Sequence, residues 1–309
     1  MDERYICVVG AVNLDIGGRP FAPLVMLDSN PGQITVSPGG VGRNIAHNLR
    51  LLGQRVSLLT AFGEDGPAAE LRESCLALGM DLGHAWTVPG GRSSIYLYLT
   101  DSQGDMVLGL SDMELTACIT PEYLERQRPV LDGAALVVLD GNLPEETLLW
   151  VGDHVEAPLL ADPVSAAKCR KLLPLLPRLH SFKPNAIEAA ALTGETDPAR
   201  AALALCRMGV RRSFVTLGAE GAVCAEGERL LRLPCPETRL RNATGGGDAF
   251  TAALAVACLM ETDLEGAARL GLAAGAVAVA APGAISPDMG LDRILEVRDA
   301  GYYRPAECL

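Results

Sequence analysis

Short continuous apolar runs alternate with amphipathic segments along most of this 309-residue chain. The runs have the length and composition of fully buried β-strands, and they lie at residues 5–12, 55–62, 134–140, 157–162 and 213–218. Segments with helical periodicity lie between them, at residues 42–52, 67–78, 185–192 and 198–208. This alternation predicts an α/β fold with a doubly wound, mostly parallel sheet flanked by helices. Ligands of such sheets bind at the carboxyl ends of the strands, where we expect the functional residues.

Two stretches do not follow the alternation of strands and helices. Residues 16–37 have no helical periodicity and contain the turn-forming run DSNPG. Residues 92–110 consist of two β-prone runs on either side of a turn at Asp101–Gly104, which is the pattern of a hairpin. We predict that the two stretches form a small separate sheet that acts as a lid over a substrate site. An ordinary antiparallel edge of the main sheet is the alternative.

No internal repeat, low-complexity tract or flexible linker divides the chain. Apolar residues make up 49% of the sequence and charged residues 21%, which is enough for a sizeable core. We therefore predict a single domain over residues 1–309, with lid segments at about 16–37 and 92–110.

The formal net charge of −12 argues against nucleic-acid binding, which needs surfaces rich in Lys and Arg. It does not argue against a small anionic ligand, because backbone N–H groups can bind a phosphate without a basic surface.

The nine cysteines include no C-x-x-C pair, and most lie within apolar runs. They predict reduced core thiols and a cytoplasmic location. The N-terminal sequence MDERYICVVG predicts a strand and not a signal peptide. The small apolar stretch at residues 270–285, which Pro282 interrupts, predicts a buried helix and not a membrane span.

The sequence ATGGGDAF (residues 243–250) places three glycines before an apolar helical pattern. Glycine removes side chains from the approach path of a ligand, and the first N–H groups of a helix have no partner within the helix. Together they predict an anion cradle that suits a phosphoryl group in transfer. Asp248 lies in the first helical turn, where a carboxylate can take the proton from an attacking hydroxyl. The alternative is a helix cap after a plain turn; a Walker A loop is excluded because no Gly-Lys-Ser/Thr follows.

Two motifs nearer the N-terminus carry side chains suited to a sugar. PGGVGRN (residues 38–44) is a second glycine-rich turn before a helix, and Asn44 can both donate and accept hydrogen bonds, which suits a diol. NLD (residues 13–15) follows the first predicted strand, and the Asp15 carboxylate can accept two hydroxyl hydrogen bonds. A plain strand–helix turn and a solvated loop acid are the respective alternatives.

Two further motifs suit a nucleotide and its metal ion. In KPNAIE (residues 183–188), Asn185 and Glu188 share one helix face and could hold a hydrated Mg²⁺ at a triphosphate, although the same spacing is that of a capping box. In TLGAEG (residues 216–221), two glycines at a strand end let a nucleotide approach the backbone closely. The four histidines are not spaced as a metal cluster.

In their order along the chain, the motifs NLD, GGVGRN, KPNAIE and ATGGGD resemble the ribokinase-like (PfkB) carbohydrate kinase family. The resemblance extends over nearly the whole length, and the two glycine motifs are similar to the two signatures of the family. It implies a doubly wound α/β domain with a small β-sheet lid, and a homodimer formed through that lid. It also implies ATP and Mg²⁺ as cofactors and a small-molecule nucleoside substrate, with neither nucleic acid nor membrane as partner.

Within the family, the chain resembles the pseudouridine kinase branch. The residues that carry this likeness are DSNPG (28–32), SPGGVGRNIAHNL (37–49), SSIYLYL (93–99), DM (112–113) and DPVSAAK (162–168). The implied activity is transfer of the ATP γ-phosphate to the ribose 5′-hydroxyl of pseudouridine.

The resemblance also implies a role for each matching residue. Asp248 matches the catalytic base, and the anion hole is matched by Gly245, Gly246 and Gly247. The positions that match the sugar site are Asn13, Asp15, Gly40 and Asn44. The nucleotide site is matched by Asn185, Thr216, Gly218, Gly221 and Thr244, and the metal site by Glu188. The candidates for contacting the base are Ser29, Asn30, Ser94, Tyr96, Asp112 and Lys168.

The chain departs from the family signature Asp-Thr-x-Gly-Ala-Gly-Asp at two positions. Asn242 stands where the first Asp is usual, and the family often uses that acid in binding a monovalent cation, so a K⁺ requirement stays open. Gly246 stands where Ala is usual, and the loss of one methyl leaves the cradle usable.

Two alternatives to a pseudouridine kinase remain at this stage. One is another kinase of the family, acting on ribose, a ketose or a purine nucleoside. The other is a catalytically inactive regulator that binds a nucleoside. A dehydrogenase fits poorly, because no G-x-G-x-x-G follows the first strand.

Overall fold

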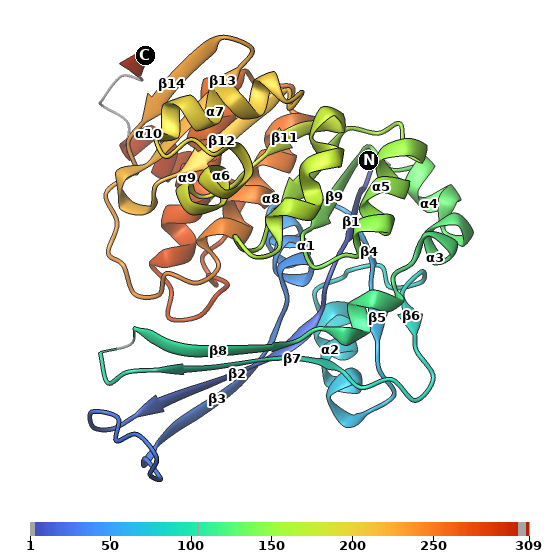
Figure 1. Ribbon diagram of the computed structural model, residues 1–309, viewed down its shortest axis with the longest axis vertical. Helices are drawn as coiled ribbons and strands as arrows, with labels where there is room; N and C mark the ends of the chain where they lie inside the picture. The colour runs from blue at the N-terminus through green and yellow to red at the C-terminus, as the bar shows by residue number, and fades with distance from the viewer. Residues whose placement is uncertain (1–3, 104, 302–306, 309) are drawn as a thin grey trace.

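A nine-stranded sheet forms the centre of the protein, in a computed structural model that describes residues 4–103, 105–301 and 307–308 (Figure 1). From one edge to the other its strands are β4 (Val56–Leu59), β1 (Ile6–Val9), β9 (Leu136–Asp140), β10 (Leu159–Asp162), β11 (Leu179–Phe182), β12 (Arg212–Thr216), β13 (Ala222–Glu226), β14 (Arg229–Leu233) and β15 (Glu307–Cys308). Neighbours from β4 to β12 are parallel, and those from β12 to β15 are antiparallel. The predicted α/β class with a mostly parallel sheet is confirmed.

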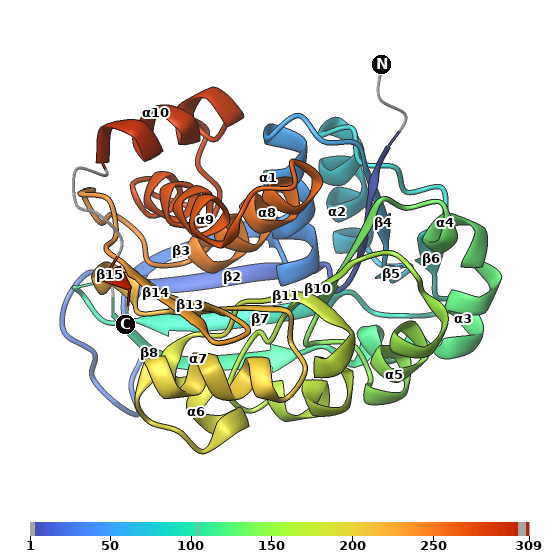
Figure 2. The same ribbon diagram turned by 90° about the horizontal axis from the view of Figure 1, so that it is seen from above.

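Helices cover both faces of this sheet (Figure 2). One face is covered by α1 (Val41–Leu51), α2 (Gly66–Ala77), α8 (Gly246–Leu259), α9 (Leu264–Val279) and α10 (Leu291–Gly301). The other is covered by α3 (Pro121–Arg126), α4 (Arg128–Asp132), α5 (Glu145–His154), α6 (Ala186–Thr193) and α7 (Pro198–Arg207). Three 3₁₀ segments complete the set: η1 (Glu114–Cys118), η2 (Cys169–Arg178) and η3 (Gly218–Glu220).

The strands supply alternate residues to the two cores, because successive strand side chains point to opposite faces. In β1, Ile6 and Val8 pack in the core beneath α1 and α8, whereas Cys7 and Val9 pack in the core beneath α5 and α7. Burial on both faces explains why these strands are continuous apolar runs in the sequence.

A separate four-stranded sheet stands apart from the main layers (Figure 1). Its order is β3 (Gly32–Gly39), β2 (Asn13–Pro20), β7 (Ser94–Thr100) and β8 (Met106–Asp112). The two stretches that break the sequence alternation therefore do form a small sheet, and the second is the predicted hairpin. Gly104, in the predicted turn, lies outside the described residues.

The sequence-based boundaries were wrong in two places, and three strands were missed. Residues 55–62 are not one strand: β4 ends at Leu59, and β5 (Ala61–Phe62) pairs instead with β6 (Trp86–Thr87). The motif Asn13–Asp15 opens strand β2 and is not a loop. The short strand β11 and the antiparallel hairpin β13–β14 were not predicted, because their alternation of small, polar and apolar residues carries a weak strand signal.

Three other features concern the apolar stretch near residue 270, the cysteines and the lengths of the helices. The apolar stretch near residue 270 lies in the buried helix α9. Eight cysteines are unpaired thiols, and the side chain of Cys308 is outside the described set. Over the described ranges, no helix combines the length and apolar character that crossing a membrane requires.

Candidate active site

The two glycine motifs, far apart in the sequence, meet through a hydrogen bond between Asn44 and Asp248. Asn44, in the first turn of α1, donates from Nδ2 to Asp248 Oδ2 at 2.9 Å. Asp248 lies in the first turn of α8, whose N-cap Gly245 has a left-handed φ of 86°. A side chain at Gly245 would also collide with the backbone carbonyl of Ala284, so glycine is required there.

Burial shapes the charge state of Asp248. Burial, followed by the nearby charge of Asp162, raises the pKa of Asp248 from 3.8 to about 8, although the Asn44 hydrogen bond and the Lys183 ammonium oppose the shift. A carboxylate that exchanges its proton near neutral pH is suited to general-base catalysis.

An ion pair accompanies this carboxylate at the ends of two adjacent strands. Lys183 Nζ lies 3.3 Å from Asp162 Oδ2, and both side chains are almost completely buried. Thr251, one turn beyond Asp248 on α8, donates from Oγ1 to the same Asp162 oxygen at 2.9 Å. Although burial disfavours the ammonium, the charges of Asp162, Glu188 and Asp248 outweigh it and raise the pKa of Lys183.

Gly245, Gly246 and Gly247 form the rim of the first turn of α8. The first N–H groups of a helix have no partner within it and carry the positive end of its dipole. A Cβ added at Gly247 would lie 3.2 Å from Lys183 Nζ, so the absent side chain leaves this face of the turn open. Free N–H groups beside a buried ammonium fit the negative charge of a phosphoryl group.

The predicted sugar site lies where the small sheet joins the main domain. Asn13 donates from Nδ2 to Asp15 Oδ1 at 2.6 Å. The strand register pairs Asn13 with Gly39, and a side chain at Gly39 would collide with the Asp15 carboxylate. Burial raises the pKa of Asp15, whereas Asn13 and the Arg43 guanidinium lower it. Gly40 is the N-cap of α1, with a φ of 101°.

Two buried residues that the sequence did not single out hold this region together. Asp140, at the end of β9, accepts backbone hydrogen bonds from Ala11 at 2.7 Å and from Gly42 at 2.8 Å, and so ties the loop after β1 to the start of α1. Arg43, with only 5% of its surface exposed, donates to the Pro38 carbonyl at 3.2 Å.

The candidates for contacting the base are distributed over four parts of the chain. Ser94 and Tyr96 lie on β7, paired in register with Asn13 and Asp15 on β2, and so belong to the neighbourhood of the sugar site. Lys168 precedes η2 and donates from Nζ to Asn142 Oδ1 at 2.6 Å.

The three other candidates for the base lie on β8 and on the loop between β2 and β3. Asp112 is exposed at the end of β8. Ser29 and Asn30 lie in the loop between β2 and β3, at the outer end of the small sheet (Figure 1). Within one chain, the structure does not bring that loop to Asp248, and its part in substrate binding stays a prediction.

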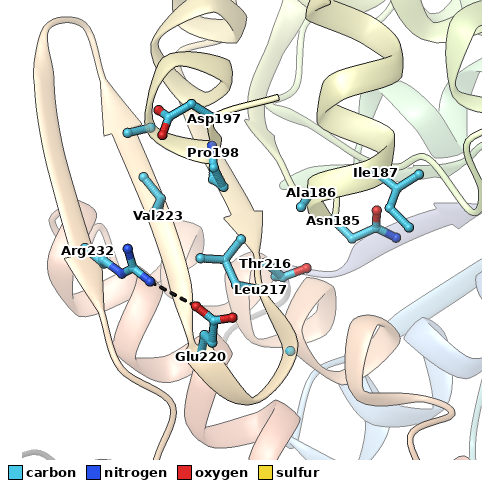
Figure 3. Close-up of a pocket in the computed structure, with 12 residues that line it drawn as sticks. Asn185, Ala186, Ile187, Asp197, Pro198, Thr216, Leu217, Glu220, Val223 and Arg232 are labelled. Carbon is cyan, nitrogen blue, oxygen red and sulfur yellow. Dashed lines mark hydrogen bonds and ion pairs between the residues drawn. The ribbon is translucent and has the colours of Figure 1, made fainter. Parts of the chain in front are cut away.

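The predicted nucleotide motifs line a cavity of about 610 Å³ (Figure 3). Asn185, Thr216 and Gly218 belong to its wall, and a bridge pairs Asn185 with Thr216. At the rim, Arg232 contacts Glu220 at 3.1 Å. The lining residues do not include two candidates: Gly221, which turns the chain into β13, and Thr244, which donates its N–H to Asn242 Oδ1. Their roles in nucleotide binding stay predictions.

Asn185 and Glu188 form the capping box that was the structural alternative. Asn185 Oδ1 accepts from the Glu188 N–H at 2.9 Å, and Glu188 Oε2 accepts from the Asn185 N–H at 2.8 Å. The box uses one oxygen of each side chain. No group of three or more His, Cys, Asp or Glu side chains within the described ranges could form a metal cage. This arrangement fits Mg²⁺ held largely by water and phosphate oxygens, with Glu188 close by.

Sequence reasoning missed Asp162, Lys183, Thr251 and Asp140 as members of this site. Asp162 and Asp140 are the last residues of buried strands, and Lys183 follows β11 directly. The rule that ligands bind at carboxyl strand ends would have identified the two acids, but β11 itself was not predicted.

Comparisons with known proteins identify the family of the chain. Residues 3–289 match the pfkB family of carbohydrate kinases. The chain is 34% identical to the pseudouridine kinase of Escherichia coli K12 over 316 residues, covering 100% of this chain and 99% of the relative. It is 26% identical to the guanosine-inosine kinase of Exiguobacterium acetylicum, covering 89% of this chain and 94% of the relative.

Solved structures share the whole architecture. A carbohydrate kinase from Agrobacterium tumefaciens is 29% identical and superimposes with a TM-score of 0.84, covering 99% of this chain and 100% of the other. A ribokinase from Thermotoga maritima, at 23% identity, shares the fold with a TM-score of 0.85, covering 96% of this chain and 99% of the other. With a family match over nearly the entire sequence and these full-length relatives, the chain belongs to the pfkB family of carbohydrate kinases.

Proposed function

We infer that this kinase transfers the γ-phosphate of ATP to the ribose 5′-hydroxyl of pseudouridine, giving pseudouridine 5′-phosphate and ADP. Membership of the family makes it a phosphotransferase with an alcohol group as acceptor. The observation that carries the proposed mechanism is the hydrogen bond from Asn44 to Asp248, because it joins the sugar motif to the phosphate motif.

In the proposed reaction, Asp248 takes the proton of the 5′-hydroxyl as its oxygen attacks the γ-phosphorus. The bond from that phosphorus to the bridging oxygen of ADP breaks at the same time. The N–H groups of the first turn of α8 stabilise the charge on the transferring group. ATP lies in the cavity beside Thr216 and Gly218, and bound Mg²⁺ would neutralise part of the triphosphate charge.

The small sheet serves as a lid in this proposal. Asp15 and Tyr96 are register partners on β2 and β7, so they share one face of the sheet. Closure of that face over the sugar would exclude water, which competes as phosphoryl acceptor.

The opposite face of the small sheet supports a homodimer formed through the lid. Val36, Ile16, Leu97 and Leu110 form one cross-strand row, and Ile34, Gly18, Leu99 and Leu108 form the next. Several of these side chains are exposed, with Ile34 at 73% and Leu110 at 60%. An apolar sheet face with several exposed side chains is suited to burial against a second copy of the chain.

Pseudouridine as the substrate is supported by the full-length similarity to a pseudouridine kinase. The base candidates Ser94, Tyr96 and Lys168 belong to this proposal, as do Asp112, Ser29 and Asn30. A cytoplasmic location is supported only by the unpaired cysteines.

A coupled ADP-release assay over pseudouridine, uridine, adenosine, ribose and fructose tests the substrate. We expect the highest kcat/KM for pseudouridine. A higher value for ribose, fructose or adenosine would transfer the assignment to another kinase of the family. The inactive-regulator alternative requires that no compound releases ADP, with Asp248→Asn as the blank for contaminating activity.

A further inference from the structure

The buried ion pair between Asp162 and Lys183 connects three elements near the N-terminus of α8. Lys183 Nζ is 3.3 Å from Asp162 Oδ2, and each side chain is only 7% exposed. The two residues come from the ends of β10 and β11, which are adjacent parallel strands. Thr251 fastens the pair to α8, because its hydroxyl donates to the same Asp162 oxygen at 2.9 Å.

The ammonium of this pair reaches the first turn of α8. A Cβ at Gly247, the residue before Asp248, would lie 3.2 Å from Lys183 Nζ. A buried ion pair gains little net stability, because desolvation of both charges offsets their attraction. Its location beside the catalytic carboxylate therefore calls for a role other than stability.

We propose that Asp162 and Lys183 are positioning residues that act through Asp248: Asp162 anchors the ammonium and α8, and the two opposite charges set the protonation of the Asp248 carboxylate. The proposal rests on the proposed function, in which Asp248 is the general base. Neither residue is required to contact the substrate.

The charged groups that face Asp248 come from three strand ends: Asp140 on β9, Asp162 on β10 and Lys183 after β11. Asn44 on α1 faces it as a neutral hydrogen-bond donor. After burial, the Asp162 charge is the strongest influence raising the pKa of Asp248, whereas Lys183 lowers it. Lys183 also faces Glu188 on α6. The two members of the pair thus act on Asp248 in opposite directions.

The pH dependence of kcat/KM tests this proposal, since its acid limb reports the pKa of the base in the free enzyme. Asp162→Asn keeps the shape of the side chain and removes the negative charge, so the limb should move to lower pH by about one unit. Lys183→Met removes the positive charge, and the limb should move to higher pH by about one unit. The double variant should return close to the wild-type limb, because both charges are gone.

A second measurement reads the carboxylate without catalysis. The ¹³C resonance of the Asp248 carboxyl, assigned by its loss in Asp248→Asn, can be titrated in wild type and in each variant. The control variants are Arg212→Met and Glu226→Gln, which break a partly buried ion pair of 2.9 Å on β12 and β13. Both control variants should leave the acid limb of the kcat/KM profile and the titration of the Asp248 carboxyl unchanged.

Opposite shifts of the two single variants, with cancellation in the double variant, would support the proposal. Shifts in the same direction, or losses of the activity plateau without any shift, would overturn it and leave the pair a structural role. If Asp248→Asn kept full activity, the proposed function would fall, and the carboxyl titration would still decide whether the pair controls its charge.

Discussion

The carboxyl edge of the nine-stranded sheet and the small four-stranded sheet arrange their side chains in opposite ways. At the edge, Asp162 and Lys183 are almost completely buried and each polar group contacts another. On the small sheet, every residue of β8 is exposed, and so are Ile34 and Val36 on the same apolar face.

This difference shows how the fold separates chemistry from contact with ligand or partner. Groups that must be positioned accurately lie on elements fixed by packing on two faces. A sheet that is half exposed is held by fewer contacts, so it can move over a ligand or be completed by a second copy.

The largest effect is expected for Asp248→Asn at the carboxyl edge of the main sheet. Turnover should fall by about 10²–10⁴-fold, because the asparagine amide cannot take the hydroxyl proton. Nucleoside affinity, measured by calorimetry, should change little. Parallel losses of binding and turnover would indicate a folding role for Asp248 instead.

The same variant should change stability with a defined sign. The folded-state pKa of Asp248 lies above its ordinary value, so folding favours the protonated carboxyl. The contribution of this carboxyl to the free energy of unfolding is fully present below pH 3.8 and is lost as the pH rises to about 8. It is lost because the carboxyl of the unfolded chain ionises at a lower pH than that of the folded chain. Asp248→Asn should therefore melt at a higher temperature than wild type at pH 8, but not at pH 4.

The next effect concerns the exposed sheet and is a change in oligomeric state. Leu110→Asp places a charge in the centre of the apolar face, and the dimer should dissociate in light-scattering measurements, while thermal unfolding of the main domain changes little. Leu76→Asp on α2 is the matched control, because Leu76 is similarly exposed at 54% and lies outside the small sheet. A monomeric wild type, or a dimer that survives Leu110→Asp, would remove the dimer from the proposal.

The smallest effect concerns K⁺ beside the cradle. Asn242 donates from Nδ2 to the Pro282 carbonyl at 3.1 Å and accepts from the Thr244 N–H, so a neutral amide ties this loop. When K⁺ is left out of the buffer, wild-type activity should change by less than about twofold. This corresponds to a change of less than ~0.5 kcal/mol in the activation free energy.

Asn242→Asp should create a K⁺ response at the same place. The new carboxylate would face the Pro282 carbonyl without a donor between them, so activity should fall in K⁺-free buffer and recover when K⁺ is added. Strong activation of the wild type by K⁺ would contradict this account.

Several features of the protein could be predicted from the sequence because they depend on local pattern. Continuous apolar runs and helical periods predicted the α/β class, and the turn at Asp101 predicted the hairpin β7–β8. Three glycines before an apolar helical pattern predicted the N-terminus of α8, with Asp248 in its first turn. The order of the motifs predicted the family.

Only the tertiary structure decided which of these pieces meet. No local sequence pattern predicts the hydrogen bond from Asn44 to Asp248 or the ion pair between Lys183 and Asp162. Nor does one predict that residues 55–62 divide between two sheets. These contacts join residues far apart in sequence, and they depend on strand order and register, which the packing of the whole chain selects. Local periodicity specifies which face of an element is buried, but it does not specify what lies against that face.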